Sequence, residues 1–253
     1  HLPMLSVLLV EDVELNVTVA CALLEKLGHQ VTVARDGSEA LALLASTCFD
    51  LVFLDIQLPD MTGFDIAAHL RQKAKEQSCT LPPLVALTAN VIRDKQEYLA
   101  KGMDDAISKP LSSKAIKGVL ARFFAHLPAA EETASKPVLT QQAATKPALT
   151  QSPIPNAVAK GELAAQEELI LDTVFLNDYV ETVGAAILLS SVEMLEGMAP
   201  DYLSQLNTFI EHQSKEAIVE EAHKIKGAAG SVGLKRAQQL AQQIQSPNLP
   251  EWE

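Results

Sequence analysis

Polar residues with the chemistry to hold phosphate stand directly after short apolar runs in the first half of the chain. They are the pair Glu11-Asp12, Asp55, Thr88 and Lys109. The carboxyl ends of parallel strands meet at one edge of an open α/β sheet, where such sheets bind their ligands. An acidic pair, a lone aspartate, a hydroxyl and a lysine at that edge predict a site for a divalent metal and a phosphoryl group.

The charges of these groups are complementary. Carboxylates that lie close together raise each other's pKa, and a hard divalent cation with oxygen ligands reverses this effect. In phosphoryl transfer such a cation bridges donor and acceptor oxygens, while a lysine neutralises the charge on the phosphoryl group. Asp55 would then be the carboxylate nucleophile that forms an acyl phosphate.

This set of motifs, in this order, resembles the receiver domain of two-component signalling. The resemblance implies that Asp55 is phosphorylated with Mg²⁺ as the cofactor. The metal ligands that it implies are Glu11, Asp12, Asp55 and Gln57. Asp12 would bind the ion directly and Glu11 mostly through water. Thr88 and Lys109 would hold phosphoryl oxygens.

A histidine motif lies in the second half of the chain, on a predicted helix. His223, Lys226, Gly227 and Gly230 fall at i, i+3, i+4 and i+7, which places them on one helix face. Each glycine costs a helix about 1 kcal/mol relative to alanine. We therefore expect these glycines to let a second domain approach the imidazole closely. Lys226, one turn from His223, can balance phosphoryl charge.

The second motif resembles the H-x-x-K-G core of the histidine phosphotransfer (HPt) domain. The resemblance implies that His223 accepts a phosphoryl group from Asp55 or from a separate receiver. A neutral imidazole near pH 7 can attack a phosphoryl group without a metal of its own. The order of receiver, linker and HPt domain resembles the carboxyl-terminal part of a bacterial hybrid sensor histidine kinase. The partners so implied are the upstream kinase domain of the same protein and a separate response regulator.

Strand and helix patterns alternate through residues 5–126. The expected strands lie near residues 7–10, 31–33, 50–54, 84–88 and 106–108, with amphipathic helices between them and after the last. Such βα units predict an α/β fold with a doubly wound, five-stranded parallel sheet. The resemblance to receivers implies a flavodoxin-like strand order.

Composition changes after this domain. Residues 127–167 carry an imperfect Pro/Ala/Thr/Gln repeat, which predicts a flexible linker. Residues 168–253 predict an all-α HPt bundle in which Asp172 caps the first helix and Pro200 kinks or interrupts the second. Because the chain stops soon after Pro250, we expect the last helix of the bundle to be missing.

Charge and hydropathy limit the partners. The formal net charge is −12, and residues 161–253 hold 5 basic and 15 acidic side chains. This balance disfavours nucleic acid and suits a basic-rimmed protein surface.

No apolar run reaches the roughly 18 residues of a membrane span, so we expect no membrane contact from this fragment. The chain begins at His1 and is interpreted as a piece of a longer protein, in which any membrane anchor would lie upstream. Its scattered cysteines favour the cytoplasm.

Other functions compete with a phosphorelay module. A haloacid-dehalogenase-type phosphatase also places an aspartate after a strand, but it needs a second aspartate two residues later, where this chain has Gln57. A phosphorylation-independent interaction scaffold would not need Glu11-Asp12, Thr88 and Lys109. The sequence contains no ATP-binding glycine motif. We therefore expect phosphotransfer alone and no kinase activity from this fragment.

Overall fold

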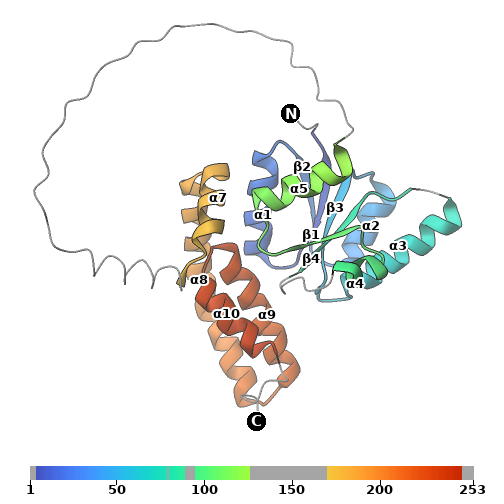
Figure 1. The fold of residues 1–253 in the computed structure, drawn as a ribbon. Helices are drawn as coiled ribbons and strands as arrows, with labels where there is room; N and C mark the ends of the chain where they lie inside the picture. The colour runs from blue at the N-terminus through green and yellow to red at the C-terminus, as the bar shows by residue number, and fades with distance from the viewer. Residues whose placement is uncertain (1–3, 79, 89–94, 126–169, 247–253) are drawn as a thin grey trace, which may run out of the picture.

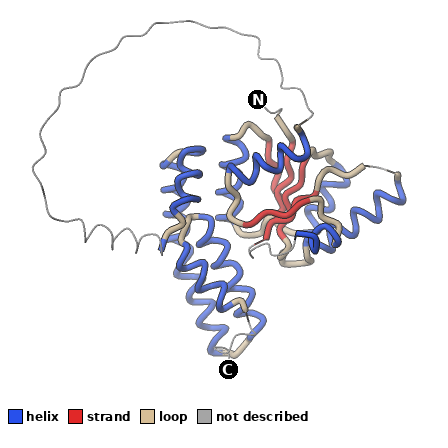
Figure 2. The backbone as a smooth tube through the Cα atoms, viewed as in Figure 1, coloured by secondary structure: helices blue, strands red, loops and turns tan. Residues whose placement is uncertain are grey.

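The computed structural model describes residues 4–78, 80–88, 95–125 and 170–246. The predicted linker therefore lies almost wholly outside the described residues. Figures 1 and 2 show a central sheet with helices on both faces, and a set of helices packed beside it. Among the described residues, no helix is long and apolar enough to cross a membrane.

The sheet has five parallel strands in the order β2-β1-β3-β4-β5, as the sequence predicts. The strands are β1 (Ser6–Val10), β2 (Gln30–Ala34), β3 (Leu51–Asp55), β4 (Leu84–Thr88) and β5 (Asp105–Ser108). Successive side chains of a strand face opposite sides of the sheet. Leu9 and Phe53 accordingly enter one apolar cluster, and Leu8 and Leu54 enter the other.

Helices cover both clusters. They are α1 (Glu14–Lys26), α2 (Gly37–Ser46), α3 (Gly63–Gln77), α4 (Lys95–Ala100) and α5 (Ser113–Phe124). Helices α1 and α5 pack over the first cluster, and α2 and α3 pack over the second. Capping residues fix several starts: Thr62 and Asp65 form a capping box on α3, and the Ser112 hydroxyl accepts from the Ala115 amide of α5.

The second domain is helical. Its helices are α7 (Thr173–Val183), α8 (Ala185–Glu211), α9 (Lys215–Ser231) and α10 (Lys235–Ile244). Asp172 caps α7 as predicted, accepting a hydrogen bond from the Phe175 amide. Of the two outcomes predicted for Pro200, interruption of the second helix is wrong, because α8 continues through this residue. Helix α9 packs between α8 and α10.

The two domains share one apolar core. Phe175, Tyr179 and Val183 recur along one face of α7 and are buried with Leu15 and Val19 of α1 in the first cluster. In Figure 1, α7 stands beside α1, and α8, α9 and α10 extend from the same side of the sheet. The helical domain is therefore docked on α1, at the end of the sheet where the predicted site lies.

Candidate functional site

The acidic residues come together at the carboxyl edge of the sheet. Strands β1 and β3 are paired neighbours, with Val10 opposite Leu54. Glu11 and Asp12 follow β1, while Asp55 is the last residue of β3. Each of these three side chains has an oxygen within 4.8 Å of the others. The register of two strands therefore builds a compact triad of carboxylates.

Lys109 closes this triad on one side. Its ammonium group donates to Asp55 Oδ2 at 2.7 Å and to Glu11 Oε2 at 3.1 Å. Burial alone would lower the pKa of Lys109, but the charges of Asp55 and Glu11 outweigh it and raise this pKa well above its usual value. The lysine therefore stays charged and holds both carboxylates in place.

Burial raises the pKa values of the three acids. It is the largest effect on Glu11 and Asp55, although Lys109 opposes it in both. Burial and then the charge of Glu11 raise the pKa of Asp12 to about 6. Asp12 Oδ1 is buried and has no hydrogen-bond partner among the residues described. An oxygen-only triad with an unpartnered carboxylate oxygen fits a hard divalent cation such as Mg²⁺.

Thr88 and Gln57 border the same edge. Thr88 ends β4 one residue beyond Leu87, which pairs with Asp55. The Thr88 hydroxyl oxygen accepts a hydrogen bond from Tyr98 at 3.2 Å. The main-chain amide of Gln57 donates to Asp55 Oδ1 at 3.1 Å. All the predicted residues of the first domain therefore converge at this edge.

His223 of α9 lies against the receiver-like site. It is 8% exposed, and it lines a cleft of about 520 Å³ between the domains together with Asp12 and Gln57. Burial and then the charges of Lys109, Lys226 and Lys224 lower the pKa of His223 to about 3. The imidazole is therefore neutral near pH 7, and it is close enough to the triad to be influenced by Lys109.

The glycines beside His223 have different surroundings. A Cβ placed at Gly227 would lie 2.7 Å from Asn16 Nδ2 of α1, so this glycine admits the first domain as predicted. A Cβ at Gly230 would instead lie 2.6 Å from Nε2 of Gln238 in α10. The prediction that Gly230 opens the same approach is therefore wrong. Its absent side chain makes room within the helical domain.

Lys226 also faces its own domain. It is buried, and its ammonium group donates to the side-chain oxygen of Gln242 in α10. Burial and then the charge of Lys109 lower the pKa of Lys226 to about 8. The structure thus places this predicted site residue next to α10.

Motif reasoning missed two polar residues at the junction. Gln245 contacts His223 Nδ1 at 3.0 Å and donates to Gln57 Oε1 at 3.1 Å. Asn16 donates to Glu11 Oε1 at 3.2 Å and accepts from the Ser231 hydroxyl at 2.7 Å. No motif marks either residue in the sequence, because each acts through a contact between distant segments.

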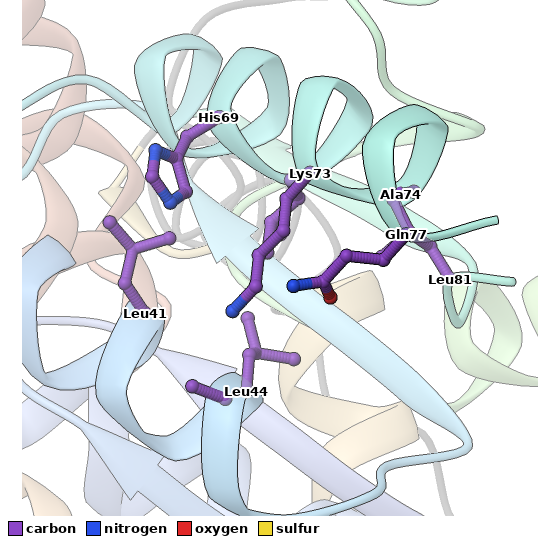
Figure 3. A pocket seen from close by; sticks show the side chains of 9 residues that line it. Leu41, Leu44, His69, Lys73, Ala74, Gln77 and Leu81 are labelled. Atoms are coloured by element: carbon purple, nitrogen blue, oxygen red, sulfur yellow. The ribbon is translucent and has the colours of Figure 1, made fainter. Parts of the chain in front are cut away.

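A second hollow lies on the other side of the sheet, between α2 and α3. In Figure 3, His69, Lys73 and Gln77 of α3 point toward Leu41 and Leu44 of α2. The hollow has a volume of about 130 Å³. It borders the second apolar cluster, so it is separate from the carboxylate triad.

Comparisons with known proteins identify both domains. Residues 7–121 match the family of the response regulator receiver domain, and residues 190–253 match the Hpt domain family. Over 252 residues the chain is 47% identical to the aerobic respiration control sensor protein ArcB of Escherichia coli. The motifs around Asp55 and His223 predict this resemblance. That alignment covers 100% of this chain and 29% of the sensor protein, so the chain spans less than a third of this relative.

Two solved structures are similar to parts of the chain. One is the histidine-containing phosphotransfer domain of ArcB from Escherichia coli, with 50% identity, a TM-score of 0.34, and coverage of 34% of this chain and 74% of that one. The other is the receiver domain of the sensor histidine kinase PA1611 from Pseudomonas aeruginosa, with magnesium in its active site cleft. Its identity is 31%, its TM-score is 0.42, and it covers 48% of this chain and 98% of that one.

Proposed function

We propose, on the premise that this chain belongs to the receiver and Hpt region of the hybrid sensor histidine kinases, that it is a phosphorelay module. In this proposal Asp55 and His223 are its two phosphoryl acceptors. The observation that carries the proposal is the position of His223, which is buried beside the triad that contains Asp55. A phosphorylation-independent scaffold would not require His223 to share a cleft with Asp12 and Gln57.

The receiver residues have distinct tasks in this proposal. Glu11, Asp12 and Asp55 would hold Mg²⁺, with Gln57 beside them, and the unpartnered oxygen of Asp12 supports this assignment. The bound ion would neutralise negative charge that gathers on the transferred group. Lys109, which is already paired with Asp55, would bind an oxygen of the phosphoryl group. The Thr88 hydroxyl would donate a hydrogen bond to another of these oxygens.

Transfer to His223 conserves atoms and electrons. A lone pair on the imidazole forms the new bond to phosphorus, while the bond between phosphorus and Asp55 breaks and its electron pair restores the carboxylate. The other ring nitrogen keeps its proton. The side-chain nitrogen of Gln245 lies 3.0 Å from Nδ1 and helps to fix the orientation of the ring.

Lys226 has a supporting task. Its charge lies one helical turn from His223, which would stabilise a phosphoryl group on that ring. Its bond to Gln242 keeps the ammonium group near α10, so it would act as a positive charge at short range.

The partners follow from the two acceptors. We propose that the kinase domain of the same protein supplies phosphoryl groups to Asp55, and that a separate response regulator exchanges them with His223. We propose the cytoplasm as the compartment, where Cys21 and Cys48, both free thiols, would stay reduced. The fragment would transfer phosphoryl groups without consuming ATP.

A labelling experiment tests the function. The chain is incubated with radiolabelled acetyl phosphate and Mg²⁺, and the bound label is assigned to aspartate or histidine by its chemical stability. Hydroxylamine removes it from an aspartyl phosphate, and acid removes it from a phosphohistidine. We expect both kinds in the wild type, only the first in His223→Gln, and neither in Asp55→Asn. Equal labelling of Asp55→Asn and wild type would refute the assignment.

A further inference from the structure

Helix α7 contacts the receiver domain although it lies outside the Hpt family match, which begins at residue 190. It packs against both α1 and α5 (Figure 1). The contact combines a buried aromatic face with a carboxylate, and these two parts recognise different helices of the receiver.

The aromatic part packs on α1. Tyr179 is 0% exposed, and its hydroxyl donates to the Val19 carbonyl at 3.3 Å. A buried tyrosine hydroxyl needs a partner, and a main-chain carbonyl of α1 supplies it. Because this acceptor is main chain, the bond selects for the shape of α1 and is indifferent to the side chain at that position.

The carboxylate part caps another helix of the receiver. Asp178 Oδ2 accepts from the Ser113 amide at 2.8 Å, and Asp178 Oδ1 accepts from the Ser113 hydroxyl. Ser113 is the first residue of α5, and the first turn of α5 has no acidic residue of its own. A helix amino terminus carries unsatisfied amides and a partial positive charge. Asp178 supplies the missing carboxylate from the other domain.

We propose that α7 is a docking helix that selects this chain's own receiver, with Asp178 as the positioning residue. The partner surface that it recognises is a receiver whose fifth helix begins with a hydroxyl residue and lacks an acidic cap. This inference rests on the proposed function. It adds that transfer between Asp55 and His223 takes place within one docked chain, and that a receiver without this surface competes poorly for His223.

The first test is transfer within one chain. Asp55 is labelled with acetyl phosphate, and movement of the label to His223 is timed. Asp178→Asn should slow this movement about tenfold or more, the factor expected for loss of a charge-assisted hydrogen bond. Labelling of Asp55 should be unchanged. Glu181→Gln removes the same charge from an exposed position of the same helix and should match the wild type.

The second test measures an increase in the rate of transfer between two chains, which a misfolded variant could not produce. A His223→Gln chain labelled at Asp55 donates to an unlabelled Asp55→Asn chain. Adding Ser113→Ala to the acceptor chain weakens the hold of its own receiver on α7, while the donor's receiver keeps Ser113. We expect transfer between the chains to become several-fold faster. A misfolded acceptor would be slower.

The outcomes separate this inference from the function. Absence of label on His223 in the wild type would refute the proposed function itself. If the wild type transfers, an unchanged rate in Asp178→Asn, no gain from Ser113→Ala, or a wild-type rate constant that falls on dilution would each refute selection by α7.

Discussion

Replacing Gly227 by alanine should stabilise the helical domain and at the same time impair transfer. The three atoms nearest to the added Cβ all belong to Asn16 of the receiver, the closest at 2.7 Å. Real Cβ atoms do not approach a nitrogen so closely, so Asn16 must move. Within α9 the substitution should contribute about 1 kcal/mol, because alanine is the better helix former.

The cost of moving Asn16 can be estimated from its partners. Asn16 donates to the carboxylate of Glu11 and accepts from Ser231, and it is buried. A hydrogen bond to a charged group contributes about 1.5–3 kcal/mol and a neutral one about 1 kcal/mol. Losing most of this should weaken docking by about 2–3 kcal/mol, a factor of roughly 30 to 150.

Two measurements on one variant check this expectation. Denaturant unfolding of the Gly227→Ala chain should show no loss of stability in the helical domain, whereas label should move from Asp55 to His223 much more slowly. The matched control is Gly197→Ala in α8, where an added Cβ has no atom within 4 Å among the residues described. Gly227→Ala transferring as fast as Gly197→Ala would show that the close approach does not matter.

Further predictions concern the acceptors and the metal. Asp12→Ala should lower Mg²⁺ affinity severalfold or more in a titration, because it removes a direct ligand; unchanged affinity would exclude Asp12 from the site. Wild-type Mg²⁺ affinity should fall as the pH falls below about 6, since the pKa of Asp12 is raised to about 6 and the proton competes with the ion. His223 is neutral in the folded chain with a pKa of about 3, while an unfolded histidine binds a proton near pH 6.5. At this site the unfolded state therefore binds more protons between these values, so the contribution of His223 to the free energy of unfolding should decrease as the pH falls from about 6.5 toward 3; the difference in unfolding free energy between the wild type and His223→Gln, followed against pH, measures this contribution.

The receiver could be predicted from the sequence because its signals are local. The apolar runs that end at Val10, Asp55 and Thr88 are short and buried on both faces, which is the pattern of central parallel strands. Once five such strands are parallel, residues just past their ends must share one edge. Topology places Lys109, just past β5, at the same edge as Asp55, and the long lysine side chain reaches that carboxylate.

The junction between the domains could not be predicted in the same way. Asn16 and Ser231 are 215 positions apart, and Ser113 and Asp178 are 65 apart. Each is an ordinary polar residue on a helix, and its role depends on how one finished domain packs against another. Gly230 shows the same limit: helical periodicity places it near the face of His223, but the packing of α10 decides that it faces Gln238.

Docking has a consequence for any external regulator. With the receiver in place, His223 is 8% exposed, and the apolar face of α7 is buried against α1. In the proposed relay a separate receiver would need this same imidazole, so the two receivers would bind in turn. The chain's own receiver is tethered and therefore present at high effective concentration. Transfer to another protein would then begin with undocking, and the contacts of Asn16, Ser113 and Tyr179 would set how often undocking happens.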